Sequence, residues 1–238
     1  MECVFELRFA DAQAGMIELL PGLVFGKLRG HFTRVTPLPL GQIPRLVRDQ
    51  NPTLRYAPTA ALEGSSVRMM FSNHSVAVSY VKPYAGWIKV KQSILECLNV
   101  VLETKLTGRI ERYALKYVNL LKEGSDEFDL DQTQVQIRLG NFPLRSGGSS
   151  SLHAEIELNE CINIVDIATG GRVTVPGSPE EVGVVISVDT VRNSPQSGVG
   201  TDLPQLLETL HETEKEIFFG LLKPETLKKL GPRYPATH

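Results

Sequence analysis

Two long amphipathic segments, each placed after a series of alternating strand-like runs, constrain the fold of this chain most strongly. Residues 86–105 are GWIKVKQSILECLNVVLETK, and residues 203–221 are LPQLLETLHETEKEIFFGL. Apolar side chains recur in both segments at spacings of three and four, which predicts helices that bury one face. Asp202 and Gln205 have the spacing of a capping box and mark the start of the second helix. Each half of the chain therefore ends in a helix that needs a sheet against its apolar stripe.

The strand-like runs supply that sheet. In the N-terminal run CVFELRF, Cys3, Phe5, Leu7 and Phe9 alternate with Glu6 and Arg8, which is typical of a half-buried strand. The runs VRMMFSN and SVAVSYV predict a hairpin that turns at Asn73 and His74. Further strands are predicted over residues 109–121, 133–140, 152–159, 161–168 and 181–191.

Prolines and glycines place the remaining elements. Pro21 and Gly22 suggest that the main N-terminal helix begins there, because proline is favoured in the first helical turn. Residues 36–52 hold four prolines and predict an extended connector. Pro224 starts a short terminal helix that ends at Gly231.

This order of elements predicts an α+β fold, an antiparallel sheet with long amphipathic helices packed on one face. The chain is expected to form a single domain over residues 1–238, and one arrangement has two α+β halves, 1–106 and 107–238, sharing a core. Pseudo-duplicated halves, as in TBP, are the favoured arrangement, although no residue-by-residue repeat supports them. A helix-grip fold with one curved sheet is the alternative.

Charge, hydrophobicity and cysteine content limit the cellular compartment and the classes of partner that we expect for this chain. The net charge of −2 gives no global field that attracts nucleic acid or anionic lipid. The N-terminus lacks the pattern of a signal peptide, and no stretch is apolar enough to span a bilayer, so a cytoplasmic protein without a membrane partner is expected. Cys3, Cys97 and Cys161 are far apart within apolar patterns, which favours buried, reduced thiols.

Familiar catalytic and cofactor motifs are missing from the sequence. No histidine has a second histidine or cysteine at the helical spacing that holds a metal ion, and the phosphate-binding and nucleophile-elbow motifs are absent. We therefore predict neither a metal site, a cofactor nor a catalytic residue. Asp166 and Asp189 fall in apolar strands, where a carboxylate is either an active-site group or one that meets water or an arginine. The second interpretation is favoured.

Basic residues gather in the N-terminal half. We consider an anion or nucleic-acid contact surface formed by Lys27, Arg29, Arg34, Arg45 and Arg48. The simpler alternative is pairing with the acidic connector at residues 122–131, KEGSDEFDLD, which needs no ligand.

The run RIERYALKYVNLL, residues 109–121, is best interpreted as a strand. Alternation places Tyr113, Leu115 and Tyr117 on one face with Asn119, and Arg112 on the other with Lys116. A nucleic-acid platform needs exposed aromatic rings beside basic residues, whereas one strand separates the two kinds here.

Four segments together resemble an uncharacterised, sporadically distributed prokaryotic protein family of about this length. They are FELRFA, the GW at the start of residues 86–105, RIERYALKYVNLL, and the late segment that carries Leu210, His211 and Phe218. Ala114 departs from the family pattern, which has a glycine there. The family has no established activity, and its distribution implies accessory or defence gene clusters. The resemblance selects Arg112, Tyr117, Asn119 and His211 as one candidate functional cluster.

These observations favour a non-enzymatic binding or assembly module. It is expected to recognise a protein partner, a second copy of itself or a small ligand through its sheet and loops. One alternative is an enzyme of unrecognised type that uses Arg112, Tyr117, Asn119 and His211. A weaker alternative is nucleic-acid binding through the basic N-terminal half.

Overall fold

A computed structural model describes residues 2–80, 84–122, 130–136, 138–143, 150–173, 180–194 and 202–231. Within them, nine strands form one antiparallel sheet in the order β2-β3-β4-β5-β1-β6-β11-β10-β9, and β7 and β8 form a separate small hairpin. The strands are β1 (Glu2–Ala10), β2 (Arg34–Pro37), β3 (Ala60–Glu63), β4 (Val67–Phe71), β5 (Ser75–Tyr80), β6 (Arg109–Lys122), β7 (Arg138–Leu139), β8 (Phe142–Pro143), β9 (Ser151–Leu158), β10 (Cys161–Val173) and β11 (Glu181–Asn193). The helices are α1 (Met16–Lys27), α2 (Arg45–Gln50), α3 (Pro52–Arg55), α4 (Trp87–Glu103), α5 (Leu203–Gly220) and α6 (Pro224–Leu230), with the 3-10 turns η1 (Pro39–Gln42) and η2 (Leu130–Gln132). The predicted α+β class and antiparallel sheet are confirmed.

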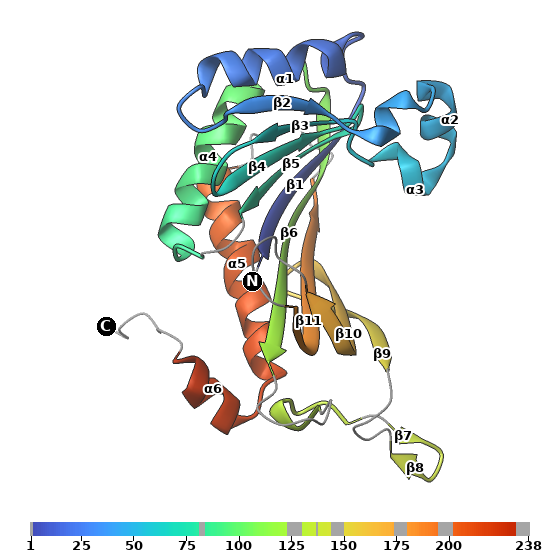
Figure 1. Ribbon diagram of the computed structural model, residues 1–238, viewed down its shortest axis with the longest axis vertical. Coiled ribbons are helices and arrows are strands. Elements are labelled where there is room, and N and C mark those ends of the chain that lie inside the picture. The colour runs from blue at the N-terminus through green and yellow to red at the C-terminus, as the bar shows by residue number, and fades with distance from the viewer. Residues whose placement is uncertain are drawn as a thin grey trace.

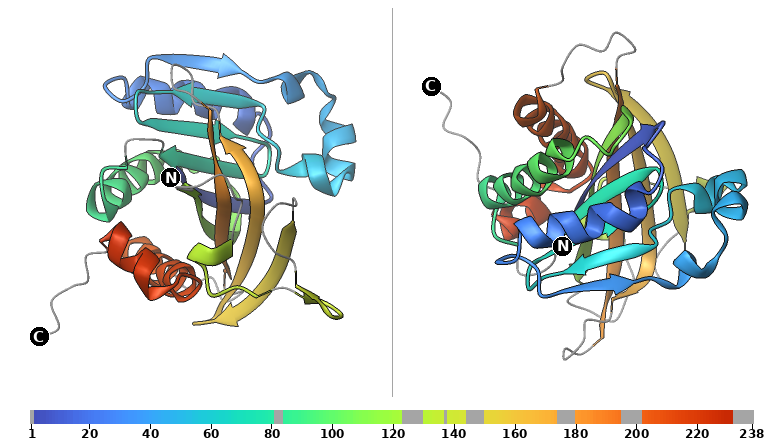
Figure 2. Two further views of the ribbon diagram at one scale, coloured as in Figure 1. Left: turned by 60° about the horizontal axis from the view of Figure 1, so that its bottom comes forward. Right: turned by 90° about the horizontal axis from the view of Figure 1, so that it is seen from above.

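Helices α1, α4 and α5 cover one face of the large sheet, and α2 and α3 lie on its other side (Figures 1 and 2). The main core forms between the covering helices and β1, where Cys3, Phe5, Leu7 and Phe9 are at most 1% exposed. A second apolar cluster joins the end of α5 to β10 and β11 around Phe218. We call the face turned away from α4 and α5 the open face.

Strands β1 and β6 form the centre of the sheet. β6 pairs with β1 on one side and with β11 on the other, so its fourteen residues hold the two parts of the sheet together. Tyr113, Leu115 and Tyr117, which the alternation places on one face, are buried under the helices. The predicted strand character of this run is confirmed.

The two long helices form where their apolar stripes predict them. The side chain of Asp202 accepts a hydrogen bond from the backbone N–H of Gln205 at 3.2 Å, which confirms the predicted N-cap of α5. The predicted hairpin corresponds to β4 and β5, and the terminal helix α6 ends at Gly231 with φ of 58°. All three cysteines are buried and free, as predicted.

Three element predictions are wrong. Helix α1 begins at Met16 and contains Pro21, because the burial of Leu20 and Val24 in the core outweighs the cost of proline inside a helix. The expected connector over residues 36–52 folds into η1, α2 and α3, and Asn51 caps α3 by accepting from Thr53 N–H. Of the strand expected over residues 133–140, only the described pair Arg138–Leu139 is extended in a ladder.

In the part of the chain that the structure describes, no helix is long and apolar enough to cross a membrane. The core of the acidic connector, residues 123–129, lies outside the described residues.

Candidate ligand site on the open face of the sheet

The structure separates the four residues of the sequence-derived cluster between the two faces of β6. Tyr117 and Asn119 face the helices and are 2% and 6% exposed. Arg112 lies on the open face, where it is opposite Arg8 of β1. His211 lies on α5 above Tyr117. Three members of the cluster are therefore on the covered side of the sheet, and Arg112 belongs to a different environment.

The covered members take part in a network between α4, α5 and β6. The hydroxyl of Tyr117 lies 3.3 Å from the hydroxyl of Tyr84 and 3.3 Å from Nδ1 of His211. The Trp87 ring stacks on His211 with centroids 4.0 Å apart, and its indole N–H donates to Glu208. Burial raises the pKa of Tyr117 and lowers the pKa of His211 to about 4, so both side chains are neutral at pH 7. This arrangement fixes the helices on the sheet.

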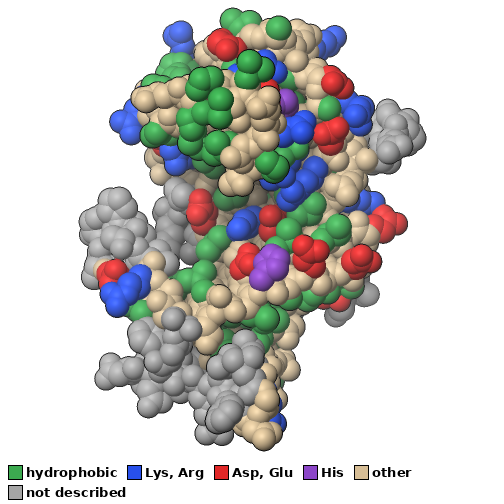
Figure 3. All heavy atoms as spheres, turned by 90° about the vertical axis from the view of Figure 1, so that its right-hand side faces the viewer, with side chains coloured by type: hydrophobic (Ala, Val, Ile, Leu, Met, Phe, Trp, Pro, Cys, Tyr) green, Lys and Arg blue, Asp and Glu red, His purple; other side chains and the backbone are tan. Residues whose placement is uncertain are grey.

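The open face carries a compact set of charges at the centre of the sheet. Neighbouring strands place Arg8 opposite Arg112, and Lys116 opposite Asp189. Glu6 accepts a hydrogen bond from Arg8 at 2.8 Å. Figure 3 shows Lys, Arg, Asp and Glu side chains mixed over this face below the α2–α3 segment. Charges of both signs alternate here, so the face differs from the uniformly basic surface of a nucleic-acid-binding protein.

Arg112 and Asp189 form an incompletely bonded pair. Their closest N···O distance is 3.7 Å, and each side chain is only about 20% exposed. Among the described residues, the buried atoms Nε of Arg112 and Oδ1 of Asp189 have no hydrogen-bond partner. Leaving such an atom without a partner costs about 1–3 kcal/mol. Desolvation raises the pKa of Asp189 and lowers that of Arg112, although their mutual attraction opposes both changes. The pair has unused capacity for a ligand that both donates and accepts hydrogen bonds.

The segment that follows α3 covers part of this charged set. The guanidinium of Arg8 lies 4.0 Å from the centroid of the Tyr56 ring, a cation–π contact. Ser75 of β5 donates its hydroxyl proton to the carbonyl of Tyr56 at 3.1 Å. His74 at the β4–β5 turn contacts Asp49 of α2 at 3.0 Å. The α2–α3 segment is thereby attached to the sheet at several points.

A cavity of about 230 Å³ lies between this segment and the open face. We call it the open-face pocket. Eight strand residues form it, together with Tyr56 and Pro58 from the covering segment. The full lining is Val4, Glu6, Tyr56, Pro58, Met70, Ser75, Ala77, Ala114, Lys116 and Asp189. Ala77 and Ala114 flank Glu6 in neighbouring strands, and their short side chains leave the space open.

Burial in the open-face pocket disfavours the ionised forms of its two carboxyl groups. Burial raises the pKa of Glu6 as well as that of Asp189, and the adjacent Arg8 counteracts this for Glu6. Perturbed titratable groups that meet in a cavity are typical of binding sites. Lys116 lies next to Asp189 and helps to hold its negative charge.

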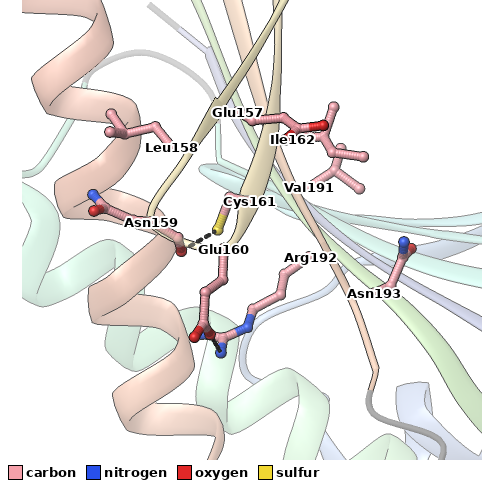
Figure 4. A pocket seen from close by; sticks show the side chains of 9 residues that line it. All are labelled: Glu157, Leu158, Asn159, Glu160, Cys161, Ile162, Val191, Arg192 and Asn193. Atoms are coloured by element: carbon pink, nitrogen blue, oxygen red, sulfur yellow. Dashed lines mark hydrogen bonds and ion pairs between the residues drawn. The ribbon is translucent and has the colours of Figure 1, made fainter.

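A second, wider hollow lies at the β9–β10 turn (Figure 4). It has a volume of about 600 Å³ and includes Cys161, Glu160 and Arg192. Arg192 forms an ion pair with Glu160, and the Cys161 thiol donates to the carbonyl of Asn159 at 3.4 Å. Glu160, Arg192 and Cys161 are therefore already engaged, in contrast to the buried Oδ1 of Asp189 in the open-face pocket.

Three of the five basic residues considered from the sequence already have partners within the chain. Lys27 pairs with Glu103 at 2.8 Å, and Arg45 pairs with Asp49 at 3.2 Å. Arg48 is 6% exposed and donates to the carbonyl of Ile43 at 3.1 Å. The remaining two, Arg29 and Arg34, are exposed.

The described residues contain no group of three or more His, Cys, Asp or Glu side chains arranged to hold a metal ion. Comparison with protein-family models gives no match, and comparison with curated proteins also gives none. The family resemblance inferred from the sequence therefore stays a prediction.

Sequence reasoning did not select Glu6, Tyr56 or Lys116 as site residues. In the sequence, Glu6 is a charged residue within an apolar alternating run, and Lys116 is a charged residue within the run that forms β6. Tyr56 gives no local signal, because it reaches the pocket only through the folding of residues 36–58 over the sheet. Asp189 meets an arginine, which agrees with the interpretation favoured from the sequence.

Proposed function

We propose that this protein is a non-enzymatic binding module that holds a compact polar ligand in the open-face pocket. The observation that carries the proposal is the Arg112–Asp189 pair, whose buried Nε and Oδ1 have no partner among the described residues. Asp189 lines the pocket, so a ligand that donates to its Oδ1 recovers the free energy that this atom loses on folding. Arg112, which lies beside Asp189 outside the lining, helps to hold the negative charge of Asp189.

The size and the lining restrict the ligand. A volume of about 230 Å³ lies below the roughly 300–1,000 Å³ typical of drug-sized ligands, so a molecule of about amino-acid size fits. Among the lining residues, Lys116 favours an anionic group, whereas Glu6 and Asp189 favour a cationic or amide donor. Val4, Ala77 and Met70 favour a short apolar portion between them. A small zwitterion satisfies all three conditions.

The alternatives receive less support from the placement of their residues. An enzyme built on Arg112, Tyr117, Asn119 and His211 needs them together, but β6 presents Arg112 on the opposite face from the others. Nucleic-acid binding needs clustered, available cations, but Lys27 and Arg45 already pair with acidic residues of the chain.

We also infer that the two halves of the fold are pseudo-duplicated, as in TBP. From the centre outward, the first half has β1, β5, β4 and β3, with β2 as an additional edge strand, and the second half has β6, β11, β10 and β9. In each half the central strand comes first in sequence, the outer strands follow, and a long helix, α4 or α5, comes last. Superposition of the two halves in an experimental structure tests this correspondence.

The binding proposal is tested by thermal denaturation and calorimetry with a panel of amino acids and related small zwitterions. Ala114→Leu fills the pocket and is expected to abolish ligand-induced stabilisation. Asp189→Asn keeps the shape, removes the charged acceptor and is expected to weaken affinity about tenfold or more. Ala168→Leu, at an open-face position outside the pocket lining, is the matched control. Equal affinity of Ala114→Leu and the wild-type protein would contradict the proposal.

A further inference from the structure

The two outer edges of the nine-stranded sheet differ in how well they are protected. One edge strand, β2, has only four residues and ends in Pro37, which cannot donate a ladder hydrogen bond. The other, β9, has eight residues, SLHAEIEL, without proline or lysine. Among the described residues, β10 is the only strand that pairs with β9. A long regular edge of this kind is a template for another strand.

The β9–β10 turn determines which backbone groups of β9 point outward. Asn159 and Glu160 have φ of 52° and 58° and form a two-residue hairpin loop closed by Leu158 and Cys161. The closing pair of such a loop is hydrogen-bonded, so even-numbered residues of β9 direct their N–H and C=O groups to β10. The bond from Thr169 N–H to the Ser150 carbonyl at 3.0 Å agrees with this alternation. Odd-numbered residues of β9 therefore direct their backbone groups outward.

The side chains of β9 also alternate. His153, Glu155 and Glu157 lie on the open face, since they are opposite Asp166, Ile164 and Ile162 of β10. Leu152, Ala154 and Ile156 lie on the helix-facing side, and Ile156 is 38% exposed. The edge thus offers an apolar row on one side and a charged row on the other.

We propose that β9 pairs antiparallel with β9 of a second copy of this chain, with Ala154 on the two-fold axis. This register places His153 opposite Glu155 of the partner subunit, and Leu152 opposite Ile156 of the partner subunit. It therefore joins opposite polar groups on the open face and apolar groups on the other. His153 already contacts Asp166 at 2.7 Å, so it would lie between two carboxylates.

The neighbouring symmetric registers are less favourable. A pair centred on Glu155 places two identical carboxylates opposite each other, and a pair centred on His153 does the same with two imidazoles. Registers that place an odd-numbered residue opposite an even-numbered one are excluded, because only odd-numbered residues direct their backbone groups outward. Such registers would also bring side chains from opposite faces of the sheet together. Charge complementarity thus selects one register. Because a single strand pair forms a small interface, the dimer is expected to depend on protein concentration.

Cysteine cross-linking tests the register directly. In the proposed pair, Ala154 occupies a non-hydrogen-bonded position, where the two Cα atoms lie about 4.5 Å apart, within the range for a disulfide. Ala154→Cys is expected to give a disulfide-linked dimer under mild oxidation. His153→Cys and Glu155→Cys are matched controls that should stay monomeric on a denaturing gel. The native cysteines are at most 2% exposed and should not react in the folded chain.

Sedimentation velocity with full-length protein tests the association itself. The wild-type dimer fraction is expected to rise through the micromolar range. His153→Glu should raise the dimer Kd about tenfold or more, and adding Glu155→Lys should restore it by making an opposite-charge pair. A wild-type protein that stays monomeric at high concentration, with no Ala154→Cys cross-link, would overturn the proposal. Preferential cross-linking of Glu155→Cys would overturn the register.

Discussion

The carboxyl group of Glu214 on α5 is predicted to make the stability of this protein fall as pH rises. Glu214 is 4% exposed, and its Oε1 has no hydrogen-bond partner among the described residues. Burial raises its pKa from 4.5 to about 8, while Lys215 opposes this rise. The folded chain therefore binds this proton more tightly than the unfolded chain does. Its contribution to stability is complete below pH 4.5 and is lost as pH rises to about 8.

The magnitude follows from the pKa values. Each pH unit between the unfolded and folded pKa changes the free energy of unfolding by about 1.4 kcal/mol. Above pH 6.5, the ordinary histidine pKa, His211 no longer contributes to the slope. From there to pH 8, the titration of Glu214 is expected to lower the free energy of unfolding by roughly 2 kcal/mol.

Glu214→Gln tests this prediction because it keeps the shape of the side chain and removes the titration. Urea unfolding at pH 6.5 and pH 8.5 should show the decrease in the wild-type protein and a much flatter response in the variant. Glu212→Gln, an exposed carboxylate on the same helix that pairs with Lys215, is the control and should change stability by about 0.5 kcal/mol or less. An unchanged pH slope in Glu214→Gln would refute the reasoning.

Three further predictions concern the framework, each with a urea-unfolding measurement. His211→Gln is expected to flatten the acid side of the stability profile, because the pKa of His211 is lowered to about 4 and stability is lost as pH falls from 6.5 toward that value; an unchanged acid limb would count against it. Asp202→Ala should cost about 1 kcal/mol through the lost cap of α5, and no loss would contradict the capping role. Gly108→Ala should cost about 3 kcal/mol or more, because a Cβ there would lie 1.6 Å from the Ala10 carbonyl oxygen, whereas Gly22→Ala in α1 meets nothing within 4 Å and should not destabilise the chain.

Much of the fold follows from local patterns in the sequence. The stripes of α4 and α5 and the alternation of β1 and β6 are strong because each element buries one face against the same core. The N-cap at Asp202 and the αL residue Gly231 mark helix ends by local chemistry alone. These features are predictable because their causes lie within a few residues.

The errors arise where distant contacts decide local structure. The prolines of residues 36–52 predict a connector, yet the contact between His74 and Asp49 and the hydrogen bond from Ser75 to Tyr56 hold this segment against the sheet. A single sequence likewise does not show which strands pair or which residues lie opposite each other. The family resemblance groups Arg112 with Tyr117, although strand alternation alone places them on opposite faces.

Hydrogen–deuterium exchange with a ligand from the zwitterion panel tests the central claim most directly. Residues 54–59 cover the open-face pocket through Tyr56 and Pro58, and they belong to no strand of the sheet apart from their junction with β3. If the ligand binds in the pocket, exchange in this segment slows at saturating ligand, and it does not slow in Ala114→Leu. Saturating binding with unchanged exchange over residues 54–59, or with protection confined to α4 and α5, would contradict the account.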